Sequence, residues 1–275
     1  MRISTNVPSL SAQRTLSETN RLKDESLSKM SSGSRINGAA DDAAGLAISE
    51  KLKANIRGLN QANRNTGDGI SLIQTAEGGL NEVSNILVRL RELSVQSASD
   101  TVGDSERQFT NLEFQNLKSE IQRISSVTEF NGKKLLDGEG GKLDFQIGVN
   151  NVDGQDRIVY DTEKVNAGIG NLGITDVNVS TKENSRSSLA SLDSAINDVS
   201  GQRAQLGALQ NRLASTSSGL QIMSENLSSA NSRIRDTDYA EETAKSAKFS
   251  ILSNAGASVL SQANAGGNMA LKLIG

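Results

Sequence analysis

The sequence predicts a mainly α-helical protein: a long antiparallel helical coiled-coil bundle in which the N- and C-terminal helices pair, with a small β-hairpin region in the middle of the chain. Apolar residues recur every three or four positions toward both ends, which is typical of helices that pack on helices. Only 3% of the 275 residues are aromatic and there is no Trp, so the chain lacks the bulky side chains that usually fill one compact globular core. Turn dipeptides and strand-like alternation are concentrated in the middle.

The first helix is expected to run from the neighbourhood of Asn6 to about Met30. The Asn6 side chain can cap its start, and Pro8 is tolerated because the first turn of a helix does not need its N–H group. Gly33 can end the helix in the left-handed conformation. Apolar residues are sparse along this segment, so its packing surface is weak.

A second helix is expected over residues 43–97, after a turn at Asn37-Gly38. Asp41 or Asp42 can cap its start. Its apolar seam repeats every seven residues: Leu52, Leu59, Thr66, Ile73, Leu80 and Leu87. The segment also contains six glycines, each of which costs up to about 1 kcal/mol relative to Ala in a helix. Either another helix approaches closely there, or the helix is shorter than the seam indicates.

A third helix is expected after a break at residues 100–104, and it should end near Thr128. Asp104 or Ser105 can cap its start. Its apolar face contains Leu117, Ile121 and Ile124.

The segment from residue 130 to about 180 is expected to be β-rich. Asn-Gly and Asp-Gly dipeptides predict turns, and residues 143–149 alternate between apolar and polar types as a half-buried strand does. Residues 157–160 are expected to form a second strand, with Asp153-Gly154 near the hairpin turn between the two.

Helix is expected to return near Ser187 and to extend to Ile234. The step from Leu206 to Leu209 is three where the alternation requires four, which predicts a local shift of the seam around the helix. The expected seam comprises Leu189, Leu192, Ile196, Val199, Arg203, Leu206, Leu209, Leu213, Thr216, Leu220, Met223, Leu227, Ala230 and Ile234.

A last helix is expected to end near Ala265. Asp238 can cap its start, and Glu241 completes an acidic version of a capping box. The helix is rich in Ala and Ser, so its packing surface is loose. Gly266-Gly267 should loosen its end before the apolar terminus at residues 269–274.

Composition excludes several classes of function. The chain has no Cys and no His, so disulfides, thiolate nucleophiles, zinc sites of the usual kinds and His general bases are excluded. The net charge of −3 gives no reason to expect a nucleic-acid partner, and no apolar run is long enough to span a bilayer. We therefore expect no enzyme and no cofactor. A coiled-coil signalling module is an alternative, but it needs a sensor domain or a membrane span.

Several long segments along nearly the whole chain carry a family resemblance: LSKMSSGSRINGAADDAAGLAI (residues 27–48), RNTGDGISLIQTAEGGL (64–80), RLRELSVQSAS (89–99), FNGKKLLDG (130–138), FQIGVN (145–150), RAQLGALQNRL (203–213) and ENLSSANSRIRDTDYAEE (225–242). In this order they resemble flagellin, the subunit of the bacterial flagellar filament.

The resemblance implies a domain organisation. Residues 1–42 and 236–275 would pair as a coiled coil in the inner tube of the filament. Residues 43–235 would form a rod-like helical bundle that includes the β region at about 130–180. Little chain separates the two helical halves, so the resemblance is to a short flagellin without outer domains. The chain ends of flagellins are disordered until they polymerise, which couples ordering to assembly.

The resemblance also implies a structural subunit that polymerises into the filament and is exported unfolded through the flagellar secretion channel. Its partners would be copies of itself, the flagellar cap and hook-junction proteins, an export chaperone at the C-terminal helix and the vertebrate Toll-like receptor for flagellin. It would act outside the cell, and a sheathed or periplasmic filament is left open. The alternative in the same superfamily is a hook–filament junction protein, which matches the internal segments less completely.

Two sets of residues are candidates for contacts. By resemblance, Arg89, Leu93, Gln96 and Glu113 match positions that the receptor binds; alternatively, Leu93 packs and Arg89 pairs with a carboxylate on a helix face. Polar residues near the helix breaks are candidates for contacts between subunits or at the linkers, with helix capping and solvation as the simpler alternative. These are Arg35, Asn37, Asp41, Asp42, Asp236 and Asp238.

Overall fold

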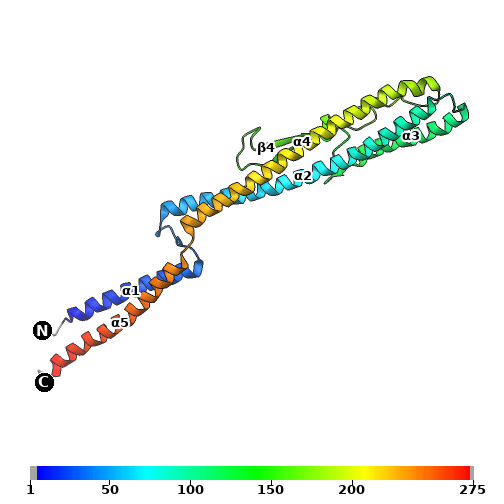
Figure 1. Ribbon diagram of the computed structural model, residues 1–275. Helices are drawn as coiled ribbons and strands as arrows, with labels where there is room; N and C mark the ends of the chain where they lie inside the picture. Colours follow the sequence, from blue (N-terminus) through cyan, green and yellow to red (C-terminus); the bar gives the residue numbers. More distant parts are fainter. Residues whose placement is uncertain (1–4, 273–275) are drawn as a thin grey trace. The chain divides into compact units, whose positions relative to one another are not determined.

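The computed structural model describes residues 5–272, with side chains described over residues 5–265. Over these residues the chain is mainly helical and its strands lie in the middle, so the predicted fold class is confirmed (Figure 1). The predicted apolar terminus lies partly outside the described residues. The elements are α1 (Val7–Ser32), α2 (Ala43–Ser97), α3 (Asp104–Val127), β1 (Glu129–Phe130), β2 (Lys133–Lys134), β3 (Lys142–Gln146), β4 (Arg157–Asp161), the 3-10 helix η1 (Thr162–Lys164), α4 (Lys182–Arg235) and α5 (Tyr239–Lys272).

The chain folds into two compact units. The bundle unit is Arg57–Ser224, and the terminal unit combines Met1–Ile56 with Glu225–Gly275. Each boundary falls inside a long helix, so α2 and α4 contribute to both units. The terminal unit is therefore built from the two ends of the sequence.

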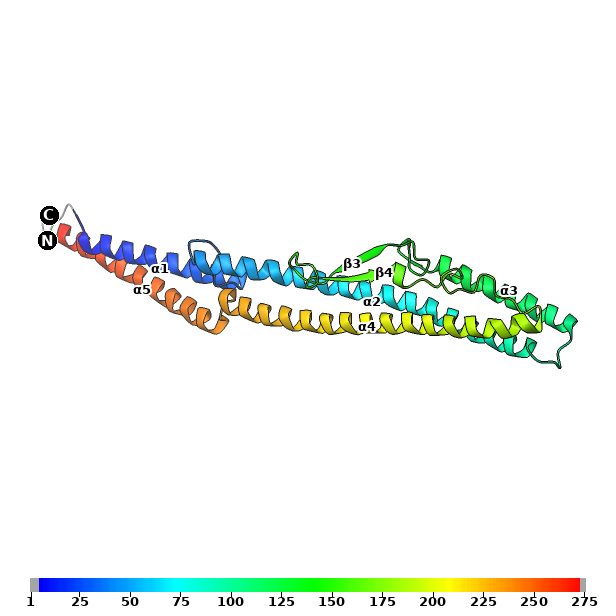
Figure 2. The same ribbon diagram turned by 90° about the horizontal axis from the view of Figure 1, so that it is seen from above.

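The seven-residue seam of α2 forms the centre of the bundle unit, where α2, α3 and α4 lie side by side (Figures 1 and 2). Its residues from position 59 onward are at most 1% exposed: Leu59, Thr66, Ile73, Leu80 and Leu87. On α4, buried apolar side chains recur at the same spacing: Leu192, Val199, Leu206, Leu213 and Leu220. The predicted pairing of the two long helices is confirmed.

Two details of the predicted α4 seam are wrong. Leu206 and Leu213 are both buried and seven residues apart, while Leu209 is only half-buried, so the seam does not shift. Met223 is 52% exposed, and its neighbour Ser224 contacts α2 instead through a hydrogen bond of 3.0 Å. A polar contact therefore replaces an apolar one at this end of the bundle unit.

The start of α4 also differs from expectation. The helix begins at Lys182, earlier than the expected start near Ser187. Thr181 caps it, because its Oγ1 accepts a hydrogen bond of 3.2 Å from the N–H of Asn184.

Arg107 joins the end of α2 to the start of α3. Its guanidinium is buried and donates hydrogen bonds of 2.9 Å to the carbonyl oxygens of Ser97 and Ser99. These groups lie at the end of α2, where carbonyls have no partner within the helix. The predicted cap of α3 by Asp104 or Ser105 is wrong: α3 starts without a side-chain cap, and Asp104 pairs with Arg107 at 2.7 Å.

The β region contains two antiparallel pairs, β1 with β2 and β3 with β4. The predicted hairpin of residues 143–149 and 157–160 is present, but β3 ends at Gln146. There the N–H groups of Ile147 and Gly148 both donate to the carbonyl oxygen of Asp156, at 2.8 and 3.1 Å. Two residues opposing one form a bulge, which ends the regular ladder.

Glycines in α2 allow the β region to lie directly on that helix. A Cβ added at Gly58 would come within 2.1 Å of Val149, and one at Gly79 within 2.7 Å of Leu136. The predicted bounds of α2 are therefore correct, since the glycines do not shorten the helix. The expected close approach of another helix is wrong at these two positions, where side chains of the β region make the contact.

Candidate functional sites

α1 and α5 lie side by side and antiparallel in the terminal unit (Figures 1 and 2). Near one end, Asn6 Nδ2 donates a hydrogen bond of 2.9 Å to the carbonyl oxygen of Ala263. Near the other, Ser26 Oγ donates one of 3.2 Å to the carbonyl oxygen of Glu242. The predicted caps of α1 are confirmed, with Asn6 at its start and Gly33, at φ 67°, at its end.

The contact between α1 and α5 mixes polar and apolar side chains, and the apolar ones on α1, such as Leu16 and Leu22, are only half-buried. Among the described side chains of α1, only Thr19 and Ser26 are buried. Other apolar side chains on both helices are 44–69% exposed: Val7, Leu10 and Leu27 on α1, and Ile251, Leu252 and Val259 on α5. Because apolar burial is the main driving force of packing, this pair gains little stability alone and presents apolar surface to a partner.

The linkers that precede α2 and α5 are tied together by their backbones. Ser34 and Asp236 form an isolated antiparallel bridge. The N–H of Arg35 donates to the carbonyl oxygen of Arg235 at 2.6 Å, and the N–H of Thr237 donates to that of Gly33 at 3.1 Å. We call residues 33–35 and 234–237 the linker clasp.

The side chain of Arg35 strengthens the linker clasp. Its Nη2 and Nε donate hydrogen bonds of 2.7 and 3.3 Å to the carbonyl oxygen of Ile234, in the last turn of α4. Carbonyls in a last turn lack partners within the helix, and a positive charge there is favoured by the helix dipole. Arg35 therefore caps a helix that begins in the other half of the chain.

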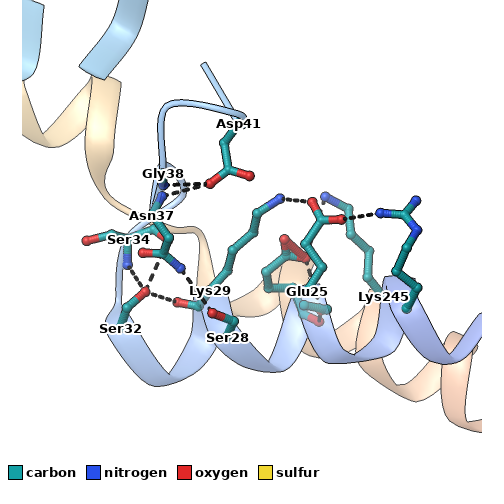
Figure 3. A network of polar contacts seen from close by, with 12 residues as sticks. Glu25, Ser28, Lys29, Ser32, Ser34, Asn37, Gly38, Asp41 and Lys245 are labelled. Atoms are coloured by element: carbon teal, nitrogen blue, oxygen red, sulfur yellow. Dashed lines mark hydrogen bonds and ion pairs between the residues drawn. The ribbon is translucent and has the colours of Figure 1, made fainter. Parts of the chain in front are cut away.

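The turn before α2 is held by two neighbouring carboxylates with different roles. Figure 3 shows the Asp41 side chain directed at the backbone of Asn37 and Gly38, whose N–H groups donate hydrogen bonds of 2.9 and 3.0 Å to Asp41 Oδ2. These bonds favour the charged form and lower the pKa of Asp41. Asp42 caps α2, because its Oδ1 accepts from the N–H of Gly45 at 2.8 Å.

All six linker candidates thus come together in the terminal unit. Asp238 caps α5 by accepting hydrogen bonds of 2.9 and 3.2 Å from the N–H groups of Ala240 and Glu241. A crevice of about 550 Å³ lies among these linkers, and its lining is charged, with acidic side chains outnumbering basic ones. Several charges pair locally, as Glu25 does with Lys29 at 2.7 Å. No three acidic side chains within the described part of the chain are arranged to hold a metal ion.

The receptor candidates lie on α2 and α3 in the bundle unit. The guanidinium of Arg89 pairs with Glu92 at 3.0 Å and with Glu113 at 2.9 Å, and the bond to Glu113 is the main cause of the raised pKa of Arg89. Leu93 is buried and Gln96 is exposed. Leu93 packs and Arg89 pairs with carboxylates, as the simpler interpretation expects. The polar groups of Arg89 and Gln96 on α2 and of Glu113 on α3 are exposed.

Two side chains that the sequence analysis did not select are also exposed. Phe109 is 71% and Leu112 is 62% exposed on α3. The sequence did not show that Phe109 and Leu112 are exposed, because α3 also has apolar residues, such as Phe114 and Ile121, that are buried. None of the helices over residues 5–272 combines the length and apolar character that a bilayer-spanning segment needs.

Comparison with known proteins gives consistent matches over the whole chain. Residues 3–140 match the family model of the bacterial flagellin N-terminal helical region, and residues 189–274 match that of the C-terminal helical region. A flagellin of Halalkalibacterium halodurans is 43% identical over 274 residues, with both chains fully covered. A flagellar filament core protein of Brachyspira hyodysenteriae is also 43% identical, over 285 residues and with full coverage of both chains.

Among solved structures, a flagellin of Bacillus cereus superposes with a TM-score of 0.51 at 28% sequence identity, over 57% of this chain and 88% of that one. The two family regions leave only residues 141–188 between them, which contain β3, β4 and the start of α4. These matches span both helical halves in their expected order. The chain therefore belongs to the bacterial flagellin family, as a short form.

Proposed function

We propose that the chain is a structural subunit that polymerises into the bacterial flagellar filament. The observation that carries this function is the weak apolar burial of α1 and α5: the apolar side chains in their contact are only half-buried, while six others are 44–69% exposed. Further copies of the chain, stacked around the pair, would bury those side chains. The names of its relatives, flagellin and flagellar filament core protein, favour the filament over a hook–filament junction. The role is structural, not catalytic.

In the assembled state, residues 1–42 and 236–275 form the inner tube, and residues 43–235 form a rod-like helical bundle. The outermost helices become fully ordered only when neighbours cover them, since ordering them alone gains little apolar burial. The linker residues Arg35, Asn37, Asp41, Asp42, Asp236 and Asp238 lie where the tube segments join the rod. Their exposed groups then contact adjacent subunits as well as the chain itself.

Truncation tests this proposal directly. Chains lacking residues 1–30 or 245–275 should form no filaments by electron microscopy, while circular dichroism still reports a folded bundle unit. A finer test compares Leu10→Ser with Gln13→Ser, because both positions are exposed on α1 but only Leu10 is apolar. Leu10→Ser should raise the concentration needed for polymerisation, and Gln13→Ser should not. Filaments that survive both truncations would refute the proposal.

Export unfolded through the flagellum, to a filament outside the cell, follows from the same role. Before export an assembly chaperone covers α5, and after export the cap and hook-junction proteins contact the growing filament. The apolar side chains of Ile251 and Leu252 on α5 support a chaperone site. The double variant Ile251→Ser, Leu252→Ser should no longer co-purify with the chaperone; retention of the complex would exclude this site.

We also propose that the Toll-like receptor for flagellin recognises the surface formed by Arg89, Gln96 and Glu113, with the buried Leu93 packed beneath it. The exposed polar groups around Arg89 support it. Arg89→Ala should weaken receptor activation. Arg123→Ala is the matched control, because Arg123 forms a similar ion pair on α3 with Glu120 at 2.6 Å. Equal activity of both variants would exclude the site.

A further inference from the structure

The chain contains two Asn-Gly dipeptides. One is fixed by hydrogen bonds to its side chain and backbone, and the other has none from any described residue at the groups that would react. In such a pair the backbone nitrogen of Gly can attack the side-chain Cγ of Asn. That step forms a five-membered succinimide and releases ammonia, and water then opens the ring to Asp or iso-Asp. The absence of a side chain on Gly makes its nitrogen accessible. Whether the reaction proceeds depends on how firmly the folded chain holds the Gly N–H and the Asn amide.

We propose that Asn131-Gly132 is a site of spontaneous deamidation and that Asp41 protects the second pair, Asn37-Gly38. This inference is independent of the proposed filament function. It concerns a covalent change in the bundle unit and a guard residue in the terminal unit.

Asn131-Gly132 is exposed at the turn between β1 and β2. Both residues have positive φ, 50° and 76°, as the turn of a two-residue hairpin requires. Within the described chain, neither the Asn131 amide nor the Gly132 N–H has a hydrogen-bond partner, and the space beside Gly132 is open. Each flanking strand has only two residues, so little holds the turn in one geometry.

Asn37-Gly38 is held at both reacting ends. The Gly38 N–H, whose nitrogen would attack, donates to Asp41 Oδ2 at 3.0 Å, and the Asn37 N–H donates to the same oxygen at 2.9 Å. The Asn37 side-chain amide donates to Ser28 Oγ at 3.4 Å (Figure 3). The Gly38 nitrogen must therefore give up its hydrogen bond to Asp41 before it can attack the Cγ of Asn37.

The modification has a structural consequence. Deamidation introduces a new carboxylate into the hairpin that contains the Glu129–Lys134 ion pair. Iso-Asp also lengthens the backbone by one carbon in a two-residue turn. The next residues, Leu135 and Leu136, are fully buried, so the turn is joined directly to the core.

Trypsin separates the two sites cleanly. Peptide 36–51 contains Asn37 as its only Asn, and peptide 124–133 contains only Asn131. The full chain is incubated at mildly alkaline pH, and amide-to-acid conversion in each peptide is followed by mass spectrometry. Peptide 124–133 should convert roughly five- to tenfold faster than peptide 36–51, the factor that opening one hydrogen bond imposes on a rate. In denaturant the two rates should become similar.

The guard is tested with Asp41→Ala, which should accelerate conversion at Asn37 and leave Asn131 unchanged. Asp24→Ala is the control, because Asp24 is an exposed carboxylate on α1 outside this network. Circular dichroism confirms that both variants retain the helices. Equal native rates at the two sites, or faster conversion at Asn37, would overturn the proposal. A slower reaction in Asp41→Ala would overturn it too, because the carboxylate would then be acting as a base.

Discussion

The guanidinium of Arg35 caps the last turn of α4 by hydrogen bonding to the carbonyl oxygen of Ile234, across 199 positions of sequence. This contact and the backbone bonds beside it join the linker that precedes α2 to the linker that precedes α5. The two linkers are therefore joined directly by hydrogen bonds.

Arg35→Ala should therefore loosen both linkers at once. We expect faster hydrogen exchange at the amide of Thr237, which belongs to the linker clasp, although the substituted residue lies in the other linker. The cost should be about 1 kcal/mol, because the lost bonds are charge-assisted but exposed. Arg57→Ala is the control, since Arg57 is exposed and lies outside the linker clasp. Unchanged exchange at Thr237 would contradict the coupling.

The turn before α2 should weaken in acid. The hydrogen bonds from Asn37 and Gly38 lower the pKa of Asp41 below the ordinary Asp value of 3.8. A carboxyl group with a depressed folded pKa stabilises the fold above its unfolded pKa, and this stabilisation is lost as the pH falls through the folded value. The free-energy difference between wild type and Asp41→Asn should be constant above about pH 5 and shrink below 3.8. Thermal unfolding at several pH values measures it, and a pH-independent difference would refute this role.

Adjacent glycines in α2 should respond oppositely to Ala. At Gly78 a Cβ meets nothing within 4 Å, so Gly78→Ala should stabilise the fold by up to about 1 kcal/mol through helix propensity. At Gly79 a Cβ would lie 2.7 Å from Leu136 and 2.9 Å from Thr128, so Gly79→Ala must displace the β region and destabilise. Chemical denaturation of both variants provides the measurement. Stabilisation by both substitutions would mean that the β region moves aside freely.

Loss of Arg107 should be costly. Arg107→Gln removes charge-assisted bonds to two carbonyls at the end of α2 and leaves buried groups without partners, so we expect a loss of about 2–3 kcal/mol. Arg123→Gln, on the exposed face of the same helix, should change the midpoint of denaturation little. Similar effects of the two substitutions would show that the buried hydrogen bonds of Arg107 do not contribute to the free energy of unfolding.

Local signals were sufficient to predict much of the fold. α2 was bounded correctly because its cap, Asp42, directly precedes it and its seven-residue seam lies within it; α1 was bounded correctly because Asn6 and Gly33 act on adjacent backbone. The hairpin of β3 and β4 followed from alternation, whereas its early end did not, because the bulge depends on Asp156 across the ladder.

Contacts that join distant segments could not be predicted in this way. Arg35 and Arg107 act as caps for helices that they do not belong to, and nothing in their own neighbourhoods indicates those partners. Met223 fits an apolar spacing, yet Ser224 makes the contact, because the partner surface on α2 is polar at that level. The linker candidates were selected because they are polar and lie at helix breaks. The structure shows which backbone groups their side chains bind, as Arg35 binds the carbonyl oxygen of Ile234.

The weak apolar burial between α1 and α5 has a kinetic consequence. A lone subunit gains little by ordering these helices, and so does a pair that has only just met, since each still leaves most of the outward apolar side chains in water. Spontaneous nucleation is therefore slow. A subunit that arrives at an existing filament end meets a preformed apolar surface. Burial of its own apolar side chains there offsets at once the conformational entropy that it loses on ordering. Elongation of an existing filament is thus favoured over nucleation of a new one.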